Sequence, residues 1–133
     1  MRLHHVAYVT RSIEERVDRL SSLLGCRPKG ELVIDEGQGV RIQFVQLNDG
    51  SLIELLEPYG EKSPVERHLR KGGGIYHTCF EVSDLEGTLD RLRQSGDAIV
   101  VREPMPAPAI SNRRVAFVVT ADQDLFEFVE CEA

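Results

Sequence analysis

The amino-acid sequence predicts an α+β fold in which two tandem βαβββ modules form a cupped, eight-stranded mixed sheet. Three observations lead to this prediction. The chain repeats itself, each repeat shows strand and helix periodicities in the same order, and turn signals separate the predicted elements. A chain of 133 residues is long enough for one domain with a sizeable core, so both modules are expected to belong to a single domain.

The repeat is visible by direct alignment. Residues 3–20, "LHHVAYVTRSIEERVDRL", align without a gap with residues 75–92, "IYHTCFEVSDLEGTLDRL", at a constant offset of 72 positions. The second halves follow at an offset of 73 positions: "RIQFV" matches "RVAFV", and "LIELLE" matches "LFEFVE". Three collinear matches indicate a duplication. The expected organisation is module 1 at about 1–57, a linker helix at 58–74 and module 2 at about 75–133.

In module 1, residues 3–9 alternate with the period of a strand, and apolar residues then recur at helical spacing from Ile13 to Leu24, where Gly25 ends the predicted helix. Three β-rich stretches follow, "ELVIDE", "VRIQFVQL" and "SLIELLE", and "NDG" predicts a hairpin turn between the last two. Module 1 is therefore predicted to be βαβββ.

In module 2, Ser83 or Asp84 is expected to cap a helix that runs to about Gln94. A strand is expected near "AIVV", and the three prolines of "REPMPAPAISN" predict a loop after it. In the linker, Ser63 is expected to cap a short helix on which His68 is a solvated surface residue.

The composition limits the partners. A formal charge of −6 and a pI near 5.2 disfavour nucleic acid or an anionic membrane surface, and no segment approaches the length of a membrane helix. The three cysteines have no C-x-x-C spacing, which favours a reducing, cytoplasmic location. Local basic patches could still bind an anion, and the candidates are Arg67, Arg70 and Lys71, and separately Arg113 and Arg114.

Two histidines and two glutamates fall on matching positions of the repeat. His5 aligns with His77, and Glu54 aligns with Glu127, all within apolar strand patterns. A single buried histidine or glutamate is more often a hydrogen-bonded structural residue, but two related modules would bring these four side chains around one point. Like charges there need a counter-charge, and two imidazoles with two carboxylates are typical ligands of Co, Zn, Ni or Mn. We therefore predict one divalent metal ion at the centre of the sheet.

The chain resembles the vicinal oxygen chelate superfamily of glyoxalases, bleomycin resistance proteins and ring-cleavage dioxygenases, whose members pair βαβββ modules around a metal. The resemblance covers essentially the whole chain and is greatest to methylmalonyl-CoA epimerases, in "LHHVAYV", "GVRIQFVQLNDGSLIELLEP", "SPVERHLRKGGGIYHTCFEV" and "LFEFVE". It places the metal ligands on the same four residues. It also implies a homodimer.

The sequence departs from the epimerase pattern at several positions. Tyr76 stands where those enzymes commonly have a second histidine, and "MPAPAISNRR" and "VVTADQD" replace a glycine-rich run and a His-Pro-Lys segment. These departures lie near the expected substrate entrance. They leave room for an acyl thioester other than methylmalonyl-CoA, including one carried on a protein.

The predicted reaction is the epimerisation of a 2-acyl thioester. The metal is expected to stabilise the enolate that forms when the α-proton is removed, and reprotonation on the other face requires a second acid/base group. The resemblance implicates Glu127 as one catalytic residue, and Glu54 is its symmetric counterpart. The family's additional base aligns near Ile42, which cannot titrate. Gln43, Arg113 and Arg114 are the candidate substrate-binding residues.

Two alternative functions remain open at this stage. The first is a glyoxalase I-like lyase that acts on a thiol hemithioacetal through an enediolate. The second is a small-molecule binding or resistance protein without catalysis. Ring-cleaving oxygenases use two histidines and one carboxylate, so the fourth predicted ligand disfavours that chemistry.

Overall fold

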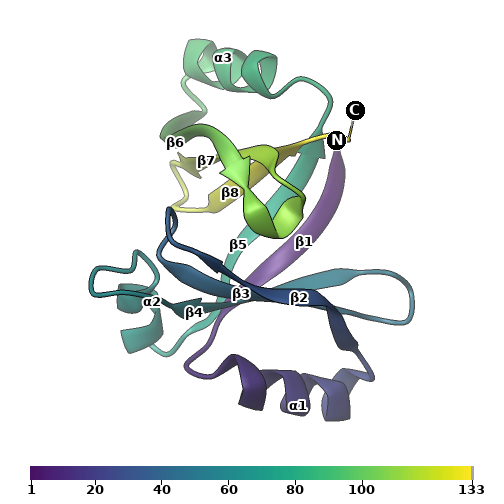
Figure 1. The fold of residues 1–133 in the computed structure, drawn as a ribbon. Helices are drawn as coiled ribbons and strands as arrows, with labels where there is room; N and C mark the ends of the chain where they lie inside the picture. Colours follow the sequence, from purple (N-terminus) through teal and green to yellow (C-terminus); the bar gives the residue numbers. More distant parts are fainter. Residues whose placement is uncertain (133) are drawn as a thin grey trace. The chain divides into compact units, whose positions relative to one another are not determined.

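The computed structural model describes residues 1–132, which contain three α-helices, one 3₁₀ helix and eight strands (Figure 1). The first repeat folds in the order β1 (Arg2–Val9), α1 (Ile13–Leu24), β2 (Arg27–Asp35), β3 (Val40–Gln46) and β4 (Leu52–Pro58). A short helix follows, α2 (Glu66–Arg70). The second repeat contains β5 (Gly74–Val82), α3 (Leu85–Ser95), β6 (Ala98–Ala107), the 3₁₀ helix η1 (Pro108–Ile110), β7 (Arg113–Thr120) and β8 (Leu125–Glu130).

Both repeats have the same topology, which confirms the predicted α+β fold class. The first strand pairs in parallel with the last strand of its repeat, β1 with β4 and β5 with β8. The other pairs, β2 with β3, β3 with β4, β6 with β7 and β7 with β8, are antiparallel. Among residues 1–132, the hydrogen-bonded order of the eight strands is β2-β3-β4-β1-β5-β8-β7-β6.

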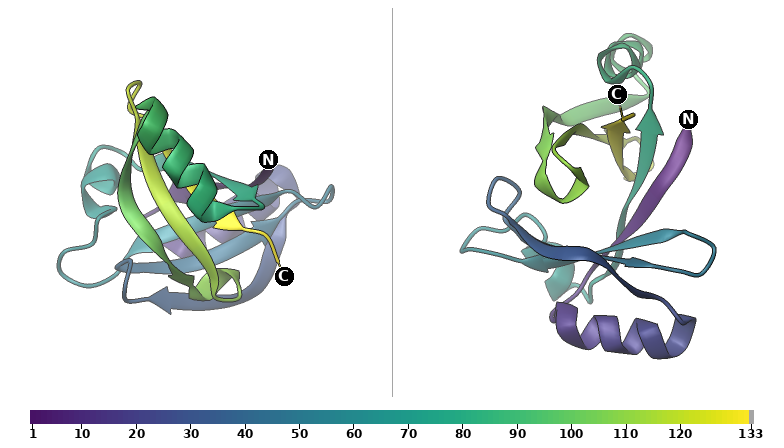
Figure 2. Two further views of the ribbon diagram at one scale, coloured as in Figure 1. Left: turned by 90° about the horizontal axis from the view of Figure 1, so that it is seen from above. Right: turned by 45° about the vertical axis from the view of Figure 1, so that its right-hand side comes forward.

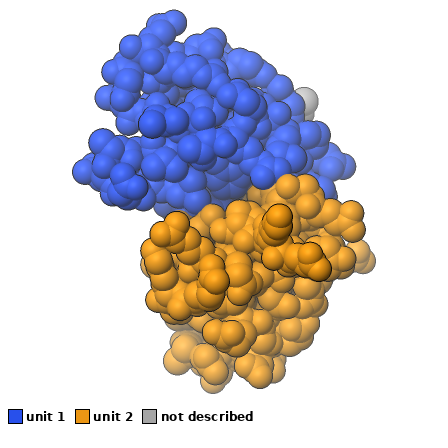
Figure 3. Space-filling view, turned by 90° about the vertical axis from the view of Figure 1, so that its left-hand side faces the viewer, with its two compact units in different colours: residues 1–4, 77–133 blue, residues 5–76 orange. Residues whose placement is uncertain are grey.

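The chain divides into two compact units, residues 1–4 with 77–133 and residues 5–76, which are coloured separately in Figure 3. In residues 5–76, Ile13 and Leu20 of α1 belong to one apolar cluster with Leu55 of β4. In the other unit, α3 covers its strands (Figure 2). Its Leu85 and Leu89 are each 1% exposed. Each unit thus has an apolar core between its long helix and one face of its strands.

The two long helices begin and end as the sequence predicts. Ser12 caps α1 by accepting a hydrogen bond from the backbone N–H of Glu15, and Asp84 caps α3 in the same way from Gly87. Gly25 and Gly96 end the helices in the left-handed conformation. None of the helices in residues 1–132 is both long and apolar enough to cross a membrane.

The predicted loop after "AIVV" is wrong. Strand β6 continues through this segment to Ala107, and only then does η1 begin. Prolines are tolerated here because β6 is an edge strand and its pairing with β7 shifts register twice, between Val100 and Met105, so Pro104 needs no ladder hydrogen bond.

The linker differs from the prediction at two residues. Val65, not Ser63, occupies the N-cap of α2, and the Ser63 hydroxyl donates instead to the carbonyl of Gly39 at 2.5 Å. His68 is not a solvated surface residue. Its ring lies 5.1 Å from the ring of Tyr76, and its Nε2 is buried with no hydrogen-bond partner among residues 1–132. Burial also raises the pKa of the Tyr76 hydroxyl.

Candidate functional site

In residues 5–76, a buried histidine and a buried glutamate lie side by side on adjacent parallel strands. His5 Nε2 lies 3.2 Å from Glu54 Oε1, and the two residues are 1% and 4% exposed. Glu54 stands opposite Ala7 of β1 in the strand register, and His5 lies two residues before Ala7, so both side chains share one face. The register of β1 with β4 therefore brings these two residues side by side.

The second unit contains an equivalent pair. His77 Nε2 lies 3.1 Å from Glu127 Oε1, and the two residues are 4% and 3% exposed. Glu127 stands opposite Cys79 of β5, and His77 lies two residues before Cys79. The register that brings His5 to Glu54 is thus repeated one module later, on β5 and β8.

Each histidine is also held by an aromatic ring. The His5 ring contacts Phe44 edge to face, with 5.2 Å between ring centroids and 80° between ring planes. The His77 ring contacts Phe117 at 5.3 Å and 82°. Phe44 pairs with Glu54 across β3 and β4, as Phe117 pairs with Glu127 across β7 and β8. These phenylalanines were not predicted as site residues, although the repeat aligns them at the same offset of 73 positions as the glutamates.

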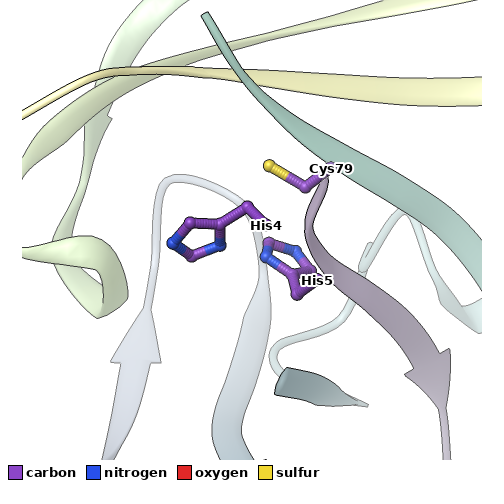
Figure 4. A group of neighbouring side chains, drawn as sticks. All are labelled: His4, His5 and Cys79. Atoms are coloured by element: carbon purple, nitrogen blue, oxygen red, sulfur yellow. The ribbon is translucent and has the colours of Figure 1, made fainter. Parts of the chain in front are cut away.

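His4 and His5 are neighbours on β1, but they are assigned to different compact units. Figure 4 shows both histidines on β1 and Cys79 on β5. A ring nitrogen of His4 lies within 4.8 Å of the sulfur of Cys79, and His4 is half-buried. A substitution of His4 could therefore disturb Cys79, which makes His68 the better histidine control for experiments on this site.

The three candidate substrate-binding residues do not all share a face with a histidine–glutamate pair. Gln43 lies on β3. Its side-chain amide donates to the carbonyls of Lys29 and Gly30 of β2 at 3.4 and 3.2 Å, and to the carbonyl of Phe44 at 2.9 Å. Its strand neighbour Phe44 is the residue that faces His5. Successive strand residues face opposite ways, so Gln43 does not share the face of the His5–Glu54 pair.

Arg114 and Arg113 point to opposite faces of β7. Arg114 lies on the face that α3 covers, where it forms ion pairs with Glu86 at 2.6 Å and Glu130 at 2.9 Å. These carboxylates raise the pKa of Arg114 and Arg114 lowers theirs. By alternation, Arg113 shares the face of Phe117. The structure therefore separates Arg114 from the face of the His77–Glu127 pair.

Arg113 is nearly buried and already has acidic partners. Its side chain is 11% exposed, its Nε donates to the Glu130 carbonyl at 2.8 Å, and its terminal nitrogen forms an ion pair with Glu81. The hydrogen bond from Arg113 is the main cause of a lowered pKa at Glu81. These contacts show a structural role for Arg113, and its predicted role in substrate binding stays a prediction.

Comparison with known proteins places the fold in a family. The family model described as "Glyoxalase/Bleomycin resistance protein/Dioxygenase superfamily" matches residues 4–117. The chain belongs to this superfamily. The resemblance inferred from the sequence is thereby confirmed.

Several proteins similar to this chain are named as epimerases of methylmalonyl-CoA. The chain is 34% identical to the mitochondrial methylmalonyl-CoA epimerase of Dictyostelium discoideum over 119 residues, which cover 88% of this chain and 69% of the relative. It is 36% identical to the ethylmalonyl-CoA/methylmalonyl-CoA epimerase of Cereibacter sphaeroides over 101 residues, 74% of each chain. A variant of the Streptomyces coelicolor methylmalonyl-CoA epimerase, solved in complex with 2-nitronate-propionyl-CoA, is 26% identical with a TM-score of 0.85, covering 100% of this chain and 99% of that one.

Proposed function

We propose that this protein is an isomerase of the methylmalonyl-CoA epimerase type, which inverts the α-carbon of a 2-acyl thioester. The repeated histidine–glutamate pair carries this proposal, because it supplies two buried carboxylates, the number of acid/base groups that an epimerisation needs. The names of the relatives support the same reaction and favour it over the lyase and the binding protein. The ligand of the Streptomyces coelicolor enzyme supports an acyl-CoA as the substrate class.

The donor atoms in each unit fit a divalent metal ion. Each pair offers one imidazole nitrogen and one carboxylate oxygen, about 3 Å apart and shielded from water. In the proposal, His5, Glu54, His77 and Glu127 are ligands of one ion from the group Co, Zn, Ni and Mn. The equivalence of the two pairs supports a shared site, since one ion with half of its ligands from each module would preserve both. The modules are proposed to span about 1–57 and 75–133, joined by residues 58–74.

When bound, the metal supplies Lewis-acid stabilisation of the negative charge that develops on the substrate oxygens. The protein residues move the proton. In the proposed reaction, a carboxylate oxygen of Glu127 accepts the α-proton as the C–H bond breaks, and Glu54, which starts the step as the protonated acid, donates its proton to the opposite face of the same carbon. After the step Glu127 carries the proton and Glu54 is the carboxylate, so the reverse reaction uses the same two groups with their roles exchanged. No net oxidation or reduction occurs. The aromatic contacts from Phe44 and Phe117 orient the two imidazoles and exclude water from the carboxylates.

Metal binding tests the ligand set directly. Chelator-treated protein is titrated with Co²⁺ or Zn²⁺ by calorimetry, and the bound metal is counted by elemental analysis. We expect one metal per chain, and His5→Ala and His77→Ala should each weaken affinity by roughly tenfold or more, since even the loss of an outer partner commonly costs that much. His68→Ala is the control and should leave affinity unchanged. The shared site would be contradicted by two bound ions per chain, or by a loss of affinity in only one of the two variants His5→Ala and His77→Ala.

Exchange of the substrate α-proton in heavy water tests the reaction. With methylmalonyl-CoA as the probe, Glu127→Gln should retain part of the metal affinity, because the amide keeps an oxygen ligand, while exchange falls by roughly 10² or more, as expected for the loss of a general base. Exchange at the wild-type rate in Glu127→Gln would remove this residue from proton transfer. Wild-type protein that binds metal but exchanges no proton would reject the epimerase proposal.

Two further properties belong to the proposal. A homodimer is supported only by the resemblance to the family, and light scattering at several concentrations tests it. A cytoplasmic location is supported by the cysteines, since Cys26, Cys79 and Cys131 take part in no disulfide bond among residues 1–132.

A further inference from the structure

A small basic pocket lies at the start of α1, in the unit formed by residues 5–76. It has a volume of about 280 Å³, and three arginines line it, Arg11, Arg16 and Arg19. Ser12, the N-cap of α1, and Gly72, just after α2, line it as well. We propose that this pocket binds the phosphate groups of a nucleotide-bearing ligand.

The three arginines are distinguished by lining one pocket together. Some other arginines of the chain are ion-paired, such as Arg41 with Glu57 at 2.7 Å and Arg93 with Glu103 at 2.6 Å. Within residues 1–132, by contrast, the three pocket arginines form no ion pair with a carboxylate. A chain with a net charge of −6 has ample carboxylates to pair them, yet it leaves three guanidinium groups around one hollow.

The acidic residues near the pocket do not neutralise it. Glu14 and Glu57 are held by Arg41, at 3.1 and 2.7 Å. Glu15 is the one carboxylate in the lining, and its side chain is exposed to solvent. Arg70 and Lys71 directly precede Gly72 and add positive charge on the α2 side. Three arginines thus line the pocket against one carboxylate, so the pocket favours an anion.

The geometry of the arginines favours phosphate over a simple carboxylate. A guanidinium group binds phosphate oxygens through two parallel N–H bonds, and three such groups around one pocket match the several oxygens of a phosphate or diphosphate. A single carboxylate would leave most of these donors unused.

The pocket is separate from the His5–Glu54 pair. Val9 lines it, and Val9 lies four residues beyond His5 on β1, roughly 13 Å along the strand. A ligand that reached both places would have to be long, with its phosphates far from the reacting carbon. An acyl-CoA has this shape, since its phosphorylated nucleotide end is remote from the thioester. A free nucleotide is the other source of the same chemistry.

Calorimetry with adenosine 3′,5′-bisphosphate at low salt tests the pocket without any reaction. We expect binding to wild-type protein, a loss of at least tenfold in affinity for the Arg16→Ala/Arg19→Ala variant, and a fall in affinity as salt rises. Alanine suits both helical positions, so the fold should be preserved. Arg27→Ala, at an exposed arginine of the same unit outside the pocket, should change the affinity less than twofold.

Kinetics then distinguish the two sources of phosphate. The first possibility, that the acyl-CoA uses the pocket, rests on the proposed function. In that case the double variant should raise KM for methylmalonyl-CoA by roughly tenfold with kcat unchanged. Its KM for the methylmalonyl-pantetheine thioester, which lacks the nucleotide, should not change. If KM is unaffected for both thioesters while bisphosphate binding is still lost, the pocket serves a free nucleotide.

The proposal is overturned if wild-type protein binds neither adenosine 3′,5′-bisphosphate nor inorganic phosphate more tightly than about 1 mM, or if Arg27→Ala weakens binding as much as the double variant. Because the binding measurement uses no catalysis, this failure is distinct from failure of the epimerase proposal. An inactive protein that still binds the bisphosphate through Arg16 and Arg19 would keep the phosphate site and reject the reaction.

Discussion

Replacing Arg113 with alanine should destabilise the protein and thereby separate its structural role from substrate binding. The guanidinium forms an ion pair with Glu81 and donates to the Glu130 carbonyl at 2.8 Å, and its side chain is 11% exposed. Hydrogen bonds to charged groups contribute about 1.5–3 kcal/mol each when shielded from water. We take about 1.5–2 kcal/mol for the bond to the Glu130 carbonyl and about 0.5–1 kcal/mol for the ion pair with the partly solvated Glu81, which gives a total loss of about 2–3 kcal/mol in the free energy of unfolding.

Urea denaturation at pH 7 measures this loss. For a domain of this size, 2–3 kcal/mol corresponds to a fall of roughly 1–2 M in the midpoint urea concentration. Arg113→Lys should recover part of the loss, because the ammonium keeps the charge but makes fewer of the hydrogen bonds.

The loss should also depend on pH. Arg113 lowers the pKa of Glu81 in the folded state, so this stabilisation is present above the unfolded pKa of about 4.3 and disappears as the pH falls through the lower folded value. The difference in stability between wild type and Arg113→Ala should therefore be largest at pH 7 and smaller below about pH 4. An unchanged midpoint at pH 7, together with a raised KM for the thioester, would refute the structural role and support a role in substrate binding.

Two packing predictions use the same denaturation assay. Leu89→Ala should cost about 2–5 kcal/mol, because the side chain is 1% exposed in the core under α3, whereas Gln94→Ala on the exposed side of the helix should cost less than about 0.5 kcal/mol; equal effects would contradict the described core. Gly73→Ala should lower the free energy of unfolding more than Gly25→Ala. Both residues have positive φ, but an added Cβ at Gly73 would lie 2.7 Å from the Val9 carbonyl oxygen, whereas at Gly25 it would meet nothing within 4 Å. A smaller loss at Gly73 would show that this contact relaxes freely.

The sequence by itself determined the elements and the candidate ligands. Helical spacing and the glycine that follows it placed α1 and its end correctly, because these signals act between residues that are close in the chain. Strand alternation separated His5 from His4, and the repeat selected His5, Glu54, His77 and Glu127 as the four candidates. Local periodicity and duplication require no knowledge of what packs against what.

Tertiary structure decided the features that depend on a distant neighbour. The prolines of β6 predicted a loop, but an edge strand needs hydrogen bonds on only one side and can include them. Ser63 had the spacing of a helix cap, but the Gly39 carbonyl, 24 residues away, takes its hydroxyl. Gln43 and Arg114 had suitable chemistry for binding a substrate, but the folded chain gives them other partners. The Gly30 carbonyl accepts from Gln43, and the carboxylates of Glu86 and Glu130 pair with Arg114. The pocket around Arg11, Arg16 and Arg19 likewise exists only because the end of β1, the start of α1 and the glycines after α2 meet in the folded unit. A side chain's partner is chosen by proximity in space, and for residues far apart in sequence that proximity arises only when the chain has folded.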